Sequence, residues 1–272
     1  MRWMPLSLGT VLAHALCFAS SLSAQGLLWS LPEDGAWIRY EGDYTQAVQR
    51  GNEAAVNLKW TRYITIRSVG RQDAEYQGVN QPCRWIEIKV ETGDASGGVL
   101  DTGPGGLRMF KLLVPEQAIR GTVFEPVPKG KEIFAAFIPV AKGYRKLGDE
   151  EPQEITSGVF DLYPVVSLLR HYPDLQPAGN PESMQLAMTA VNAQLHRGKI
   201  VVERTNYRSE NNAELYRCSE LPFGVARWNV TVQISEKATT DSRADFESTV
   251  TIREVMQAAE VGTDAESELL VN

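Results

Sequence analysis

Cysteine and histidine are scarce in this sequence, and their scarcity narrows the chemistry open to it. Only three of the 272 residues are cysteines and three are histidines. His171 and His196, the two histidines beyond the N-terminal leader, lack the ligand spacing of the usual zinc patterns. We therefore predict no metal site, and nothing in the sequence indicates a cofactor. Each histidine lies near the end of a predicted helix, where a cation interacts favourably with the helix dipole.

The short motifs of the common enzyme classes are absent too. The chain has no G-x-S-x-G elbow, no H-E-x-x-H, no P-loop and no G-x-G-x-x-G. A single Val-Leu-Asp-Thr-Gly run around Asp101 resembles the active-site loop of aspartic proteases. Those enzymes need two aspartates that share a proton, so catalysis here would require a homodimer. Because Pro104 follows and the run is rich in glycine, we interpret it as a connection between strands.

Positive charge and long apolar runs are also in deficit. Lysine and arginine number 27 against 34 acidic residues, for a net charge of −7. A nucleic-acid-binding protein carries a basic patch or stripe, so we predict no nucleic-acid partner. Beyond the leader no run reaches the roughly 18 apolar residues of a transmembrane helix, so we predict no transmembrane segment in the mature chain.

The first 24 residues have the features of a secretory signal peptide. Arg2 supplies a positive start, residues 5–19 are mainly apolar, and the run from Ser21 to Ala24 is a small-x-small cleavage signal. We therefore predict a cleaved signal peptide (1–24), a single β-rich domain (25–257) and an acidic flexible tail (258–272), in a periplasmic or secreted protein. The sequence does not indicate the oligomeric state.

Cleavage after Ala24 removes Cys17 and leaves Cys83 and Cys218. In an oxidising compartment, an even pair of cysteines is first interpreted as a disulfide. We predict a Cys83–Cys218 bond that joins an early strand to a late one. Between Cys218 and the following strand, Leu221-Pro-Phe-Gly224 is interpreted as a bend or bulge at a sheet edge, which turns Phe223 onto the apolar side.

Alternation of apolar and polar residues predicts a mainly antiparallel β fold. In residues 54–70 the apolar residues fall on even positions and the polar residues on odd ones, which is the period of a half-buried strand. Further strands are predicted at 36–44, 83–93, 107–115, 131–143, 199–207, 214–221, 224–234 and 245–255.

Two stretches show helical spacing instead. They cover residues 159–173 and 180–198; the second begins Asn180-Pro181, ends at Gly198 and carries a stripe of Met184, Met188, Val191 and Leu195. The predicted fold is a curved antiparallel sheet, or half-barrel, packed against about two helices.

An arginine interrupts the apolar face in each of three predicted strands. Arg62, Arg84 and Arg108 share the parity of their apolar neighbours. A buried guanidinium needs a partner, an exit to water or an anionic ligand. One interpretation is that Arg84 and Arg108 reach water at strand ends while Arg62 pairs with a carboxylate. The other is an apolar concavity with a basic rim, suited to an acyl chain with an anionic head.

The pattern of long alternating strands and late helices resembles the LolA/LolB-like family of bacterial lipoprotein carriers. Phe110-Lys-Leu-Leu-Val-Pro-Glu116 and the run from Leu221 to Val230 are the local stretches that carry this resemblance. It implies an unclosed β-barrel whose concave face is covered by helices and holds lipid, with arginines suited to its inner surface.

Three functions remain open at this point. The first is non-enzymatic binding of a hydrophobic or lipid-like ligand, with a lipid or an acylated protein as the partner. The second is a structural or interaction module of the cell envelope whose concavity is filled by its own side chains. The third is the dimeric hydrolase that uses Asp101. For the first function, the predicted ligand contacts are Trp60, Arg62, Ile64, Arg84, Arg108, Phe110 and Phe223.

Overall fold

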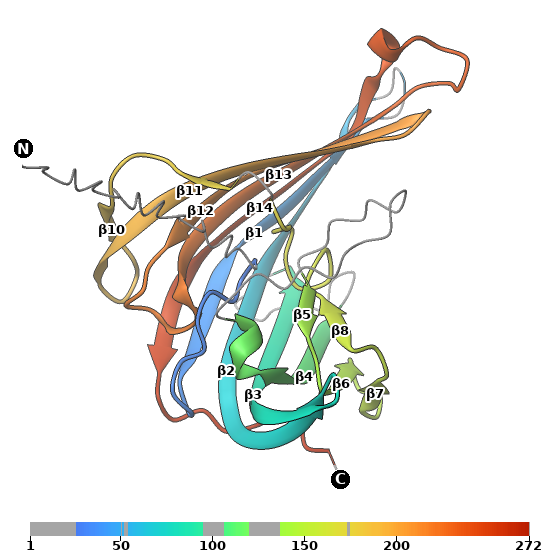
Figure 1. Ribbon diagram of the computed structural model, residues 1–272. Coiled ribbons are helices and arrows are strands. Elements are labelled where there is room, and N and C mark those ends of the chain that lie inside the picture. Colours follow the sequence, from blue (N-terminus) through green and yellow to red (C-terminus); the bar gives the residue numbers. More distant parts are fainter. Residues whose placement is uncertain are drawn as a thin grey trace, which may run out of the picture.

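The computed structural model describes residues 26–49, 51, 54–94, 106–119, 137–172 and 175–271. Within these residues, twelve strands form one large antiparallel sheet. Figure 1 shows that the sheet is strongly curved and that its longest strands run together into a projecting end. The expectation of a mainly β, antiparallel fold is confirmed.

The chain forms two meanders that meet in the middle of the sheet. The first contains β1 (Trp37–Val48), β2 (Val56–Tyr76), β3 (Val79–Gly93), β4 (Leu107–Pro115), β6 (Lys142–Leu147) and β7 (Gln153–Ile155). The second contains β10 (Glu182–Gln185), β11 (Ala190–Glu203), β12 (Tyr207–Arg217), β13 (Val225–Glu236) and β14 (Glu247–Gly262), with β9 (Gln176–Pro177) beside β11. Antiparallel pairing of β14 with β1 joins the two meanders. It therefore places β14, the last strand in the sequence order, two strands away from β2 in the sheet.

The remaining elements are short. Strands β5 (Phe137–Pro139) and β8 (Val159–Asp161) form a separate two-stranded sheet. Three short 3-10 turns occur within the described residues, η1 (Glu116–Ile119), η2 (Pro222–Gly224) and η3 (Arg243–Asp245). The order β10-β11-β12-β13-β14-β1-β2-β3-β4-β6-β7 does not pair its two ends, so the described sheet is open.

One face of the sheet, called the inner face below, carries most of the core. Tyr40, Ile64, Ile88 and Trp228 lie on this face and are at most 1% exposed. Each strand contributes every second residue to it, because successive side chains of a strand point to opposite faces. The period-two pattern in the sequence therefore correctly identified the buried side of β2 and β3.

Two stretches without regular sheet pairing complete the core over the inner face. The first, called the cover segment, consists of residues 162–172, and it buries Leu162, Val166 and Leu169. The second is the N-terminal segment, residues 26–31, in which Leu27 and Leu28 have no exposed surface. Because both stretches belong to the main hydrophobic cluster, they do the covering that the sequence pattern assigned to helices.

The two predicted helices are wrong, since no α-helix is formed by the described residues. The stretch from 159 to 172 forms β8 and the cover segment, and the stretch from 182 to 198 forms β10 and most of β11. Met184 and Val191, which looked like one helical stripe, are instead opposite each other across the β10–β11 hairpin. Pairing with β12 along ten residues of β11 overrides the local helical spacing, because a strand depends on its neighbours more than a helix does.

The predicted disulfide is wrong as well, since Cys83 and Cys218 are both free and buried. Cys83 belongs to β3, and Cys218 directly follows β12. Strands β13, β14, β1 and β2 lie between them in the sheet. At about 4.8 Å per strand, the separation along the sheet far exceeds the roughly 7 Å between Cα atoms that a disulfide tolerates.

The corner predicted at Leu221–Gly224 is present, although not at a sheet edge. It forms η2 between β12 and β13, and each of these strands has a neighbouring strand on both sides. Phe223 adopts a positive φ of 62° and has no exposed surface, so the turn does drive this ring into the core.

The C-terminal residues include the stretch from residue 258 that we expected to be an acidic flexible tail. Strand β14 continues to Gly262, and Leu269 is only 2% exposed. The amides of Glu268 and Leu269 donate to the carboxylate of Glu87 on β3, at 3.0 and 2.9 Å. The end of the chain therefore packs on the outer face of the sheet. The predicted signal peptide lies outside the described residues.

Candidate ligand site on the inner face

The centre of the inner face is filled by the protein's own groups around a buried carboxylate. Glu254 on β14 has no exposed surface. Its Oε1 accepts hydrogen bonds from Trp228 Nε1 at 2.6 Å, Ser167 Oγ at 2.8 Å and the Leu168 amide at 3.0 Å. Two of these three donors belong to the cover segment, so the carboxylate fastens that segment to the sheet.

Arg62 supplies the positive charge that the buried carboxylate requires. Its Nη1 lies 2.6 Å from Glu254 Oε2, and its Nη2 donates to the Val165 carbonyl at 3.1 Å. Arg62 is only 4% exposed. An ion pair removed from water is tolerable when further hydrogen bonds support it. Here the Val165 carbonyl accepts from Arg62 Nη2 and three donors reach Glu254, although Arg62 Nε is buried without a partner. This confirms the interpretation in which Arg62 pairs internally with a carboxylate.

A second polar contact anchors the far end of the cover segment. The Tyr172 hydroxyl donates to Asn211 Oδ1 at 2.6 Å, and Asn211 Nδ2 donates to the Leu168 carbonyl at 3.1 Å. Burial raises the pKa of Tyr172 far above its ordinary value, so the phenol stays a donor. Hydrogen bonds to both meanders thus hold the cover segment on the inner face.

Arg84, near the start of β3, also makes only internal contacts among the described residues. Its Nη2 lies 3.0 Å from Glu116 Oε1, and its Nη1 donates to the Pro32 carbonyl at 2.7 Å and to Ser68 Oγ at 3.3 Å. Burial acts to raise the pKa of Glu116, but hydrogen bonds from Arg71 and Arg84 outweigh it and lower that pKa. Arg84 is 5% exposed, so it does not reach water as one interpretation proposed.

A cleft of about 200 Å³ remains beside the packed centre, and we call it the arginine cleft. Its lining consists of Tyr44, Gln46, Trp60, Arg62, Val90, Thr92, Gly106, Arg108 and Pro164. The rings of Tyr44 and Trp60 have centroids 5.8 Å apart, and the Arg62 guanidinium carbon lies 5.6 Å from the centre of the Tyr44 ring. Burial lowers the pKa of Arg108, and the charge of Arg62 lowers it further. Two guanidinium groups and no carboxylate therefore occur among the described lining residues.

Beyond the arginine cleft, β2 continues toward the projecting end (Figure 1). The inner-face positions there form an apolar strip. The strip consists of Val48, Val56, Leu58, Ile234, Val250 and Ile252. Leu58 pairs with Gln46, one inner-face row beyond the pair of Tyr44 and Trp60. Val56 and Leu58 are 55% and 40% exposed. An exposed apolar area next to a basic cleft is characteristic of a binding surface for an amphipathic molecule.

The predicted ligand residues lie in three different places in the structure. Trp60, Arg62 and Arg108 come together in the arginine cleft. Ile64 and Phe110 are 0% and 3% exposed and belong to the hydrophobic core.

Arg84 and Phe223 lie elsewhere. Arg84 lines a separate cavity with Glu116, and Phe223 is a core residue at the β12–β13 corner. These placements leave three of the seven predicted residues at the cleft.

Sequence reasoning missed Glu254 and most of the cover segment's contacts. The signal for Glu254 was nonetheless present, because it has the parity of Val250 and Ile252 in an alternating stretch. A carboxylate on an apolar face is the natural partner for an arginine on the apolar face of another strand. The contacts of Ser167 and Pro164 had no comparable signal, because their segment was assigned to a helix.

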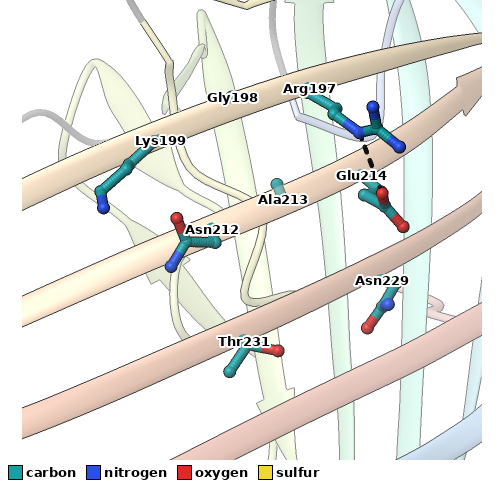
Figure 2. A pocket seen from close by; sticks show the side chains of 8 residues that line it. All are labelled: Arg197, Gly198, Lys199, Asn212, Ala213, Glu214, Asn229 and Thr231. Atoms are coloured by element: carbon teal, nitrogen blue, oxygen red, sulfur yellow. Dashed lines mark hydrogen bonds and ion pairs between the residues drawn. The ribbon is translucent and has the colours of Figure 1, made fainter. Parts of the chain in front are cut away.

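A larger groove, of about 460 Å³, lies on the opposite face of the second meander. Figure 2 shows its polar side chains projecting from β11, β12 and β13, with Arg197 hydrogen-bonded to Glu214. Asn229 lies here within β13, and its Oδ1 accepts a hydrogen bond from Arg253 at 3.3 Å. It begins Asn-Val-Thr231, which matches the N-glycosylation sequon. The exposed ion pair and the flat sheet floor make this groove a solvated strand surface.

Asp101 lies outside the described residues, so the hydrolase hypothesis stays a prediction. Among the described residues, no group of three or more His, Cys, Asp or Glu side chains is placed to hold a metal ion. No helix in that part of the chain is long and apolar enough to cross a membrane.

Comparison with known proteins does not assign the chain to a family. No protein-family model matches the chain, and no curated protein matches it significantly.

Proposed function

We propose that this protein binds, without catalysis, an amphipathic ligand that has an anionic head and an acyl or similar apolar chain. The head group occupies the arginine cleft beside Arg108 and Trp60, and the chain lies along the apolar strip. The observation that carries the proposal is the continuity of a two-arginine cleft with partly exposed Val56 and Leu58 on one face. Such a ligand also matches the carrier family that the sequence resembles.

Size and charge constrain this ligand. A cleft of about 200 Å³ is smaller than a typical site for a drug-sized molecule, so it accommodates a head group while the chain stays on the strip. Arg62 pairs with Glu254, and we assign the anionic head of the ligand to Arg108, the other arginine that lines the cleft. Ligand binding at an exported protein's open concave face is compatible with the predicted periplasmic or secreted location.

The first test uses a fluorescent fatty acid and its uncharged methyl ester with the mature protein. Arg108→Gln should weaken binding of the fatty acid by about tenfold, because a hydrogen bond to a charged group contributes about 1.5 to 3 kcal/mol. The methyl ester should bind weakly to both proteins. Arg253→Gln is the matched control, since Arg253 is exposed and lies on the opposite face of β14, the strand that pairs with β1. Equal affinity of the wild type and Arg108→Gln for the acid would refute the assignment.

The apolar strip requires its own variant. Leu58→Asn should weaken binding of the fatty acid several-fold. It should leave the free energy of unfolding nearly unchanged, because this side chain is 40% exposed. The measurement is a titration of the same fluorescent probe, with urea unfolding as the check on stability. Mass spectrometry of the purified mature protein should also detect a co-purified amphipathic anion.

The second candidate function is the structural or interaction module. The packed Glu254 cluster favours it, because much of the inner face is already filled. A protein that carries no extractable lipid and takes up neither probe would support this second function over the first.

A further inference from the structure

Another cavity lies where the N-terminal segment meets β11 and the β12–β13 corner. Its volume is about 580 Å³, within the range of sites that hold a small organic molecule. Its lining consists of Trp29, Ser30, Pro177, Pro181, Asn192, Gln194, His196, Arg217, Ser219, Glu220 and Gly224. None of these residues lines the arginine cleft, so the two sites are separate.

Trp29 forms a fixed wall of this cavity. Its backbone amide donates to the Phe223 carbonyl at 3.0 Å, and its indole Nε1 donates to the Gly26 carbonyl at 2.8 Å. Gly224 has a φ of +81°, and a Cβ there would lie 3.0 Å from the Trp29 Cβ. The corner therefore needs glycine both for its conformation and for the close approach of the tryptophan.

Arg217 stacks on this wall and has no anionic partner in the described part of the chain. Its guanidinium carbon lies 3.8 Å from the centre of the Trp29 ring. Arg217 is half-buried, and burial lowers its pKa. Its Nε is buried without a hydrogen-bond partner, as is the Nε of Arg62. The difference is that the buried arginines Arg62 and Arg84 each contact a carboxylate. A stacked, partly desolvated guanidinium that lines a cavity is suited to bind an anion at its edge.

His196 is placed to complement such a ligand as a neutral group. Its Nδ1 lies 3.0 Å from the Gln194 carbonyl, which can only accept, so this nitrogen carries the proton. Burial lowers the pKa of His196; the contact with Gln194 opposes this effect, and the nearby charge of Arg217 adds to it. Nε2 is then an acceptor for a hydroxyl or amide of a ligand.

We propose that this cavity binds a small organic monocarboxylate, whose carboxylate pairs with Arg217 and whose body packs against Trp29 and the two prolines. A monoanion fits better than a phosphate, because one guanidinium faces the cavity while the carboxylate of Glu220 also lines it. The amides of Asn192 and Gln194 and the His196 ring supply polar contacts for ligand hydroxyls. The inference is independent of the proposed amphipathic ligand.

The test titrates the mature protein with 4-hydroxybenzoate, glucuronate and lactate, and with 4-hydroxybenzamide and inorganic phosphate as comparisons. Tryptophan fluorescence and calorimetry follow binding. The Trp29→Phe variant shows which part of the fluorescence change comes from Trp29. At least one of the carboxylates should bind saturably at millimolar concentration or below. Arg217→Gln should weaken binding of that carboxylate at least tenfold, and Arg217→Lys should weaken its binding less.

Arg227→Gln is the matched control. Arg227 is another arginine with a buried, unpartnered Nε near an aromatic ring, Tyr216, but it does not line the cavity. This variant should retain the carboxylate affinity, and thermal unfolding of every variant should confirm that it is folded.

Several results would overturn the proposal. They are the absence of saturable binding by all three carboxylates, equal binding of 4-hydroxybenzamide, tighter binding of phosphate, or unchanged affinity in a folded Arg217→Gln protein. Arg108→Gln should leave carboxylate binding intact, which separates this proposal from the amphipathic ligand.

Discussion

Glu254 shows how a single carboxylate can organise the inner face. Three donors occupy its Oε1, and Arg62 occupies its Oε2, while the residue has no exposed surface. Replacing one partner leaves the other charge buried without compensation, which is more costly than the loss of the pair itself. Arg62 is therefore a poor probe of ligand binding, because its substitution disturbs the fold.

This arrangement predicts a specific pattern of stability changes. Glu254→Gln and Arg62→Met should each lower the free energy of unfolding by about 3 to 5 kcal/mol, and the double variant should lose much less than their sum. Urea unfolding of the two single variants and the double variant measures the coupling. Glu260→Gln breaks the exposed pair with Arg39 and should cost less than about 1 kcal/mol. Additive losses in the double variant would contradict the proposed dependence of one charge on the other.

At the scale of elements, the close pairing of β1 with β14 joins the two meanders. Gly42 on β1 lies opposite Met256, and a Cβ built at Gly42 would lie 1.9 Å from the Val255 carbonyl oxygen. A side chain there must displace backbone rather than a flexible side chain. The junction that brings Glu254 near Arg62 therefore depends on a glycine.

Gly42→Ala should lower the free energy of unfolding by about 3 kcal/mol or more, because the added methyl group forces the two strands apart. Thermal and urea unfolding measure the loss. Gly158→Ala is the control, since a Cβ at Gly158 meets no atom within 4 Å, and its effect should be within about 0.5 kcal/mol. A stable Gly42→Ala protein would show that β1 and β14 can separate without loss.

At the scale of the whole molecule, the end of the chain closes the outer face as the cover segment closes the inner one. Glu87 has no exposed surface; it accepts hydrogen bonds from Ser267 Oγ at 2.8 Å and from the amides of Glu268 and Leu269. Arg67 Nη1 also contacts Glu87 at 3.2 Å. Residues more than 170 positions apart in the sequence thus complete one another's hydrogen bonds.

Truncation after Gly262 should lower the free energy of unfolding by about 2 kcal/mol, since the lost hydrogen bonds and the burial of Leu269 exceed the entropy of ordering the segment. For a chain of this size, that loss corresponds to a fall in Tm of about 4 to 8 °C. Truncation after Leu269 retains all three contacts to Glu87 and should change Tm little. Equal Tm values for both truncated proteins would contradict the structural role of the C-terminal residues.

Local sequence pattern determined strands such as β2 and β3 and the face that each buries. Residues of β2 and β3 alternate with the period of two that a strand imposes, and the arginine at position 62 kept the parity of its apolar neighbours. The corner at Leu221–Gly224 was also predictable, because proline and glycine restrict or permit particular backbone angles. These features depend on neighbours in the chain, so the sequence alone contains them.

Tertiary structure decided the rest, because the deciding partners are distant in the chain. The stretch 182–198 became strand rather than helix when β12 supplied a hydrogen-bonding partner. Cys83 and Cys218 stay apart because four strands separate their positions in the sheet. Glu254 meets Arg62 across 192 residues only because β14 pairs with β1. Periodicity specifies which face of a strand is buried, whereas strand order specifies which buried groups meet, and only the latter creates a site.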